Sequence, residues 1–170
     1  MEGIDWERYA HLCDDSTELA IGRFEGTLRK AAGVATNQSI AVYAGAMKGS
    51  LVTSLRTMTD ILKEFAQSQL SETEQRKINW KKVEDRMREA YFDRLSRVDN
   101  LVIASEYVRT RIQNRSAEPE QVYRWVSSFR NPDVQIRRLV GSIREANALF
   151  VRVDVPQIMD VALLTGRSLR

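Results

Sequence analysis

The sequence predicts an all-helical protein, and three observations indicate this fold class. The 170 residues include only 8 glycines and 3 prolines, too few for the many turns of an all-β sandwich. Apolar side chains recur at steps of three, four and seven residues, which is the helical period. After Ser71, no Gly or Pro occurs until Pro119. The length fits a single helical assembly domain over 1–170 that buries a core without disulfides or metal.

Two helices are expected before residue 37. Residues 3–12 are predicted to form a short helix or turn. Asp15 is a favourable N-cap, and Glu18 stands three residues later as in a capping box. The helix that follows carries an apolar stripe and is expected to end near Gly33.

A long helix is expected from Ser39 to about residue 67. Its apolar residues form two series at seven-residue spacing, which is typical of helices packed side by side. At its start, Ala41, Gly45 and Gly49 form a smooth stripe at four-residue spacing. Glycine inside a helix costs about 1 kcal/mol relative to alanine, so this stripe indicates the close approach of another backbone.

A second long apolar stripe follows the capping box of Ser71 and Glu74 and continues to Ile112. It predicts either one helix over 72–113 or two, with a break near 96–100. The simplest arrangement is a long antiparallel hairpin within 39–113, with 39–67 packed against 72–95. Alone it leaves apolar surface exposed to water, so pairing with a second copy into a four-helix bundle is expected.

Smaller helices and an arm are expected at the base of this hairpin, over about 118–170. Pro119 and Pro132 each stand at a favourable first helical position, and the second predicts a helix over 132–150. Residues 151–155 alternate in polarity before Pro156, and 157–164 are expected to form a last turn or an extended arm.

Catalysis is not expected. His11 and Cys13 are the chain's only histidine and cysteine, and at this spacing on one helix they point in different directions. Carboxylates at 84, 85, 89 and 93 alternate with basic residues, which is typical of a solvated, ion-paired helix face. No phosphate-binding loop or di-metal motif occurs. We therefore predict a protein that is not an enzyme, has no cofactor, bound metal or small-molecule substrate, and does not cross a membrane.

The charge is divided unequally along the chain. Residues 1–75 carry 7 basic and 11 acidic groups, whereas residues 76–170 carry 19 basic and 12 acidic groups. Of the 26 basic residues, 20 are arginines, which suit phosphate recognition. Either these arginines form a phosphate-binding surface directed at nucleic-acid backbone, or they form intersubunit and intrahelical ion pairs. The predicted nucleic-acid-facing residues are Arg137, Arg138, Arg144, Arg152, Arg167 and Arg170.

Two motifs resemble the core (capsid) proteins of hepadnaviruses and their non-enveloped relatives, the nackednaviruses. Residues 122–130, VYRWVSSFR, are similar to that family's fifth helix, and residues 154–158, DVPQI, resemble its arm motif. The acidic start at Met1–Asp5 and the predicted helix order are also similar. The chain departs from the family in lacking the Trp-rich end of the fourth helix, the Pro-rich link after the fifth helix and the Arg-rich tail.

The resemblance implies a viral capsid subunit located in the virion, and in the host cytoplasm or nucleus during assembly. It would form a homodimer through its hairpin, and the dimers would build a closed shell around nucleic acid. For Trp125 and Phe129, which the resemblance places at contacts between dimers, ordinary core packing is the alternative interpretation. The residues expected at the dimer hairpin are Ala41, Gly45, Gly49, Leu51, Leu55, Met58, Leu62, Met87 and Tyr91. Those expected at contacts between dimers are Val122, Trp125, Val126, Phe129, Pro156 and Ile158.

A different class of function also fits the sequence. The chain is then a cellular helical adaptor or regulator of fixed oligomeric size. It binds a partner helix or nucleic-acid backbone through its Arg-rich C-terminal half.

Overall fold

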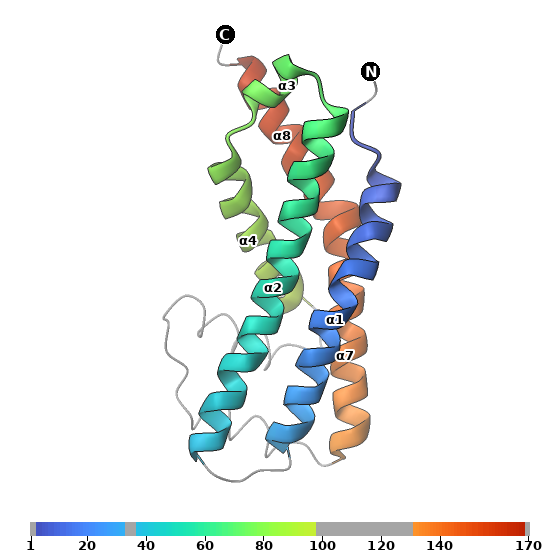
Figure 1. Cartoon of the computed structure of the whole chain (residues 1–170), viewed down its shortest axis with the longest axis vertical. Coiled ribbons are helices and arrows are strands. Elements are labelled where there is room, and N and C mark those ends of the chain that lie inside the picture. The colour runs from blue at the N-terminus through green and yellow to red at the C-terminus, as the bar shows by residue number, and fades with distance from the viewer. Residues whose placement is uncertain (1–2, 33–36, 98–130, 169–170) are drawn as a thin grey trace.

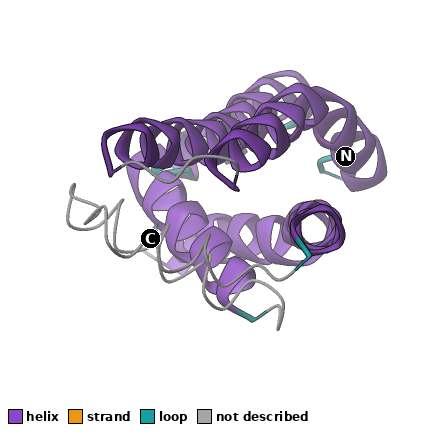
Figure 2. Ribbon diagram, turned by 90° about the horizontal axis from the view of Figure 1, so that it is seen from below, coloured by secondary structure: helices purple, strands orange, loops and turns teal. Residues whose placement is uncertain are grey.

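The computed structural model describes residues 3–32, 37–97 and 131–168, and every secondary-structure element within these ranges is a helix (Figures 1 and 2). The all-helical fold class is therefore confirmed for the described part of the chain. Helix α1 (Trp6–Ala32) descends in the view of Figure 1, α2 (Asn37–Gln69) ascends beside it, and α7 (Pro132–Leu149) lies along the other side of α1.

Helix α1 is one continuous helix, and the expected break before Asp15 is wrong. The start of the helix is capped by Asp5, whose Oδ1 accepts a hydrogen bond from the Arg8 N–H at 3.1 Å. The Asp5 N–H also donates to Gln69 Oε1 at 2.7 Å, which ties this start to the end of α2. At the expected break, Thr17 is buried and donates from its hydroxyl to the Cys13 carbonyl, so the chain keeps its helical path.

Helix α2 matches the expected long helix closely, but the segment after it is interrupted. The Ser71 capping box is present and begins the short helix α3 (Glu72–Lys77). The chain then becomes extended at Ile78, and the Asn79 side chain caps α4 (Trp80–Ser96) by accepting from the Lys82 N–H at 3.3 Å. The expectation of an unbroken helix over 72–95 is wrong because Ile78 is buried in the core and Asn79 starts a new helix. Residues 98–113 lie outside the described ranges.

The C-terminal residues continue as helix rather than as an extended arm. After α7 comes a π-helical turn η2 (Phe150–Asp154), and then α8 (Val155–Ser168). Within η2 the Val155 N–H bonds to the Phe150 carbonyl, five residues back. Pro156 has no N–H to donate and disfavours a tight preceding turn, so a widened turn lets the helix pass it without ending. The expected helix over 132–150 is confirmed.

The buried apolar residues form one cluster to which all the longer helices contribute. Its largest fully buried side chains include Tyr9 and Phe24 from α1, Met58 from α2, Tyr91 from α4 and Phe150 from η2. The most extensive packing of α2 is against α1, not against α4. The core therefore lies between α2 and α4 on one side and α1 and the C-terminal helices on the other.

Candidate functional site

Five of the residues expected at a dimer interface lie instead inside this core. Leu51, Met58, Leu62, Met87 and Tyr91 are all buried within the single chain. Because α1, α7 and η2 cover the faces of α2 and α4 that carry them, these five residues offer no surface to a second copy. Leu55 and Gly45 are only half-buried, and Gly49 is exposed. The side chain of Ala41 is outside the described part.

The remaining exposed side of α2 and α4 forms a groove of about 210 Å³, here called the α2–α4 groove. Its apolar floor comes from Val52 and Leu55 on α2 and Phe92 on α4. Its other described lining residues are Thr59 and the four charged residues Arg56, Asp60, Glu84 and Arg88. An apolar strip with charged side chains beside it resembles the core and rim of a protein interface.

Charges of opposite sign lie at the same height on the two helices of this groove. Lys63 on α2 forms an ion pair with Glu84 on α4. One turn further along α4, Thr59 contacts the sulfur of Met87. These two contacts fix the register of the helices, so Asp60 and Arg88, which both line the groove, lie within about half a helical turn of the same level.

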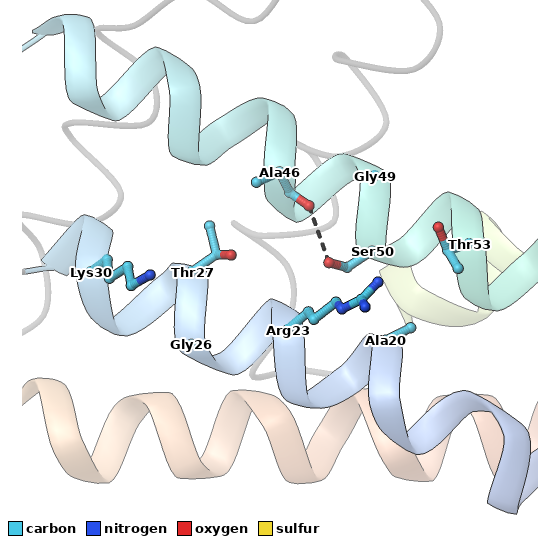
Figure 3. A pocket seen from close by; sticks show the side chains of 9 residues that line it. All are labelled: Ala20, Arg23, Gly26, Thr27, Lys30, Ala46, Gly49, Ser50 and Thr53. Carbon is cyan, nitrogen blue, oxygen red and sulfur yellow. Dashed lines mark hydrogen bonds between the residues drawn. The ribbon is translucent and has the colours of Figure 1, made fainter.

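A second groove of about 440 Å³ lies between α1 and α2, here called the α1–α2 groove (Figure 3). Its described lining is dominated by small and hydroxyl side chains, with Arg23 and Lys30 as its charged residues. The glycines Gly26 and Gly49 face open space, because a Cβ atom built on either one meets nothing within 4 Å. Sequence reasoning found Gly49 but missed Arg23, Lys30 and Gly26, because the partner helix was expected to be 72–95.

Three of the six arginines expected to face nucleic acid form ion pairs within the chain. Arg144 contacts Glu18 of α1 at 3.2 Å, and Arg152 contacts Asp14 of α1 at 2.8 Å. Arg137 pairs with Asp133, one turn before it on α7. The hydrogen bond to Asp14 raises the pKa of Arg152 above its ordinary value. Of these pairs, only Arg137–Asp133 is the intrahelical kind expected from the sequence, and the pairs of Arg144 and Arg152 join different helices of the same chain.

The other predicted contact and nucleic-acid residues are divided between described and undescribed segments. Arg138 is exposed on α7. Pro156 and Ile158 are half-buried on α8, and Ile158 packs against the core. The predictions at Val122, Trp125, Val126, Phe129 and Arg170 lie outside the described residues, and so does the side chain of Arg167.

Cys13 is placed where it has no role as a nucleophile. Its thiol is buried beside Tyr9, and burial raises its pKa to about 12, so the reactive thiolate does not form near neutral pH. His11 is exposed on α1. Among the described residues, no group of three His, Cys, Asp or Glu side chains is placed to hold a metal ion.

No helix within 3–32, 37–97 or 131–168 is long and apolar enough to cross a membrane. No protein-family model, curated protein or solved structure matches the chain.

Proposed function

We propose that this chain is a viral structural subunit that pairs with a second copy through the α2–α4 groove. The pairs then assemble into a closed shell around nucleic acid. The observation that carries this proposal is the self-complementary charge pattern of the groove. It is supported further by the resemblance to hepadnavirus core proteins at residues 122–130 and 154–158.

Self-complementarity follows from the register of the two antiparallel helices. A twofold axis parallel to α2 and α4 places α2 of one copy against α4 of the other at the same level. Asp60 then faces Arg88 of the second copy, and the reverse contact forms by symmetry. Val52, Leu55 and Phe92 of the two copies meet about one to two helical turns further along the helices and are removed from water. The α2 and α4 helices of both copies then form a four-helix bundle, as the sequence predicts. The copies meet through the exposed groove side of these helices, not through the side buried in each chain.

Charge reversal tests this pairing. We expect Asp60→Arg or Arg88→Asp to convert a dimer into a monomer, because each places like charges opposite one another. The double variant Asp60→Arg/Arg88→Asp restores opposite charges and should restore the dimer. Multi-angle light scattering measures the mass of each variant. Arg86→Asp is the matched control, because Arg86 is exposed on α4 and lies outside the groove.

A monomeric unaltered chain at micromolar concentration overturns the pairing. The same conclusion follows if the single variants remain dimeric, or if the double variant does not recover.

Shell formation is a separate step with its own test. Electron microscopy of the purified protein across salt and pH should show closed particles. Trp125→Ala should leave dimers intact and prevent shells, since a large apolar side chain at a repeated contact supplies much of its binding energy. The absence of particles under all conditions overturns the capsid function. A species of fixed small mass favours the cellular adaptor.

A further inference from the structure

The α1–α2 groove is built from two helices with the same spacing of residue types. On α1, Leu19 is followed seven residues later by Gly26 and then by Thr27. On α2, Val42 is followed seven residues later by Gly49 and then by Ser50. Helices α1 and α2 are antiparallel (Figures 1 and 3). Since each aliphatic residue precedes the glycine of its own helix, the two aliphatic residues lie toward opposite ends of the groove, with the glycines between them.

Both aliphatic residues are unusually exposed for their type. Leu19 is 68 % exposed and Val42 is 69 % exposed, the two highest values among the large apolar residues of the described chain. Each continues the helix face that lines the groove, since positions seven apart lie almost directly above one another. The face therefore offers apolar contact at both ends, and between them it has two glycines that leave space for a neighbouring backbone.

The two glycines that line the groove, Gly26 and Gly49, suit a helix more than a smaller ligand. Glycine in a helix is destabilising relative to alanine, and neither the backbone conformation nor a neighbouring atom requires it here. The separation of two packed helices depends on the side chains at their contact, so glycines allow the closest approach. A third helix seated over Gly26 and Gly49 would use the space that they leave open.

The charge of the groove selects the kind of helix. Arg23 and Lys30 line it, none of its described lining residues is acidic, and neither cation has an ion pair within the described ranges. The nearby Arg29, in contrast, is paired with Glu25 and Asp133. A second copy of the same face would bring like charges together. Residues 98–130 contain five arginines and four acidic residues and therefore carry no net negative charge.

The spacing of the two cations fits acidic residues on a helix. Arg23 and Lys30 are seven residues apart, which is about 10.5 Å along α1. Carboxylates seven residues apart on a partner helix have the same separation. We infer that the α1–α2 groove binds an acidic amphipathic helix of a different protein, with small and aliphatic residues over the glycines. Its carboxylates contact Arg23 and Lys30. The exposed Leu19 and Val42 favour this occupant over a phosphodiester strand.

A pair of synthetic peptides tests the inference on the full chain. One helical peptide carries alanine and leucine along one face and glutamates seven residues apart beside it, and the other carries lysines in place of the glutamates. We expect fluorescence anisotropy to show binding of the glutamate peptide only. Arg23→Glu/Lys30→Glu should weaken this binding at least tenfold. Lys81→Glu/Lys82→Glu is the control, because it makes the same change at two exposed lysines on α4.

Replacing both glycines with leucine gives a second test, in which the melting temperature and the peptide affinity should change in opposite directions. Gly26→Leu/Gly49→Leu should raise the melting temperature, because leucine favours a helix and meets no atom there, yet should weaken peptide binding at least tenfold. Gly141→Leu on α7 has the same open surroundings and should leave binding unchanged.

Three results overturn the inference. They are failure of the glutamate peptide to bind the unaltered chain, equal binding of both peptides, and unchanged peptide affinity in Gly26→Leu/Gly49→Leu. Displacement of the bound peptide by an equimolar single-stranded oligonucleotide assigns the groove to phosphate instead. The dimer variants at Asp60 and Arg88 lie outside this groove, so the two proposals fail independently.

Discussion

The Tyr91 hydroxyl donates a hydrogen bond of 2.8 Å to Asn147 Oδ1, and both side chains are buried. The two residues are 56 positions apart and join α4 to α7 through the centre of the core. Burial raises the pKa of Tyr91 above its ordinary value, so its hydroxyl stays protonated and remains a donor. The second polar atom of the amide, Asn147 Nδ2, has no hydrogen-bond partner among the described residues.

Replacing only one member of this pair should be costly. Asn147→Leu leaves the buried Tyr91 hydroxyl without an acceptor, which costs about 1–3 kcal/mol of unfolding free energy. Asn147→Leu/Tyr91→Phe removes both polar groups and should recover most of that loss. Urea denaturation followed by circular dichroism measures both values. A double variant no more stable than Asn147→Leu alone would show that the hydrogen bond is not the origin of the loss.

The ion pair between Arg94 and Asp154 should contribute more than the surface pairs do. It is bidentate, with contacts of 2.7 and 2.9 Å, and both side chains are only 16 % exposed. Asp154→Ala leaves the guanidinium poorly solvated, and we expect a loss of about 2 kcal/mol. Arg76→Ala, which breaks a highly exposed pair with Glu72, should cost no more than about 0.5 kcal/mol. Equal losses measured by thermal denaturation would contradict this ranking.

Cys13 should be unreactive in the folded protein. Its thiol is buried and its pKa is raised to about 12, so both access and thiolate formation are suppressed. We expect negligible labelling by a thiol reagent such as dithionitrobenzoate at pH 8, and complete labelling after denaturation. Rapid labelling of the native chain would contradict the placement of Cys13 in the core.

The contribution of Asp133 to stability should depend on pH. The hydrogen bond from Arg29 lowers the pKa of Asp133 below its ordinary value of 3.8. A lowered pKa in the folded state gives stability that is complete above the ordinary value and is lost as the pH falls through the lowered one. Asp133→Asn should therefore be less stable than the unaltered chain at neutral pH, and the difference should disappear in strong acid. An unchanged difference at low pH, measured by thermal denaturation, would contradict this.

The sequence predicts the helical content and several helix ends correctly, because those depend on local chemistry. The capping box at Ser71 and the proline at 132 act within a few residues, and both helices begin there. The break at Ile78–Asn79 and the continuous path through Asp15 depend on which side chains the rest of the chain buries. Such tertiary effects override a local cap signal.

The candidate surfaces were harder to predict for the same reason. A seven-residue apolar repeat shows which face of a helix is buried but not which helix buries it. Leu51, Met58 and Leu62 carry that repeat and are covered by their own chain. The residues that remain for interaction, such as Phe92 and Arg88, become recognisable only when α2 and α4 are placed side by side.

The acidic first half and the basic second half of the chain meet in space, and this has a consequence for how the protein folds. The ion pairs of Glu18 with Arg144 and of Asp14 with Arg152 span 126 and 138 residues of sequence. Contacts of such long separation slow folding relative to helical proteins built from local contacts. During synthesis, α1 leaves the ribosome long before the residues that neutralise it. It can pack against α2 soon after its own synthesis, but its ion-pair partners on α7 and η2 become available only when the last helices are translated.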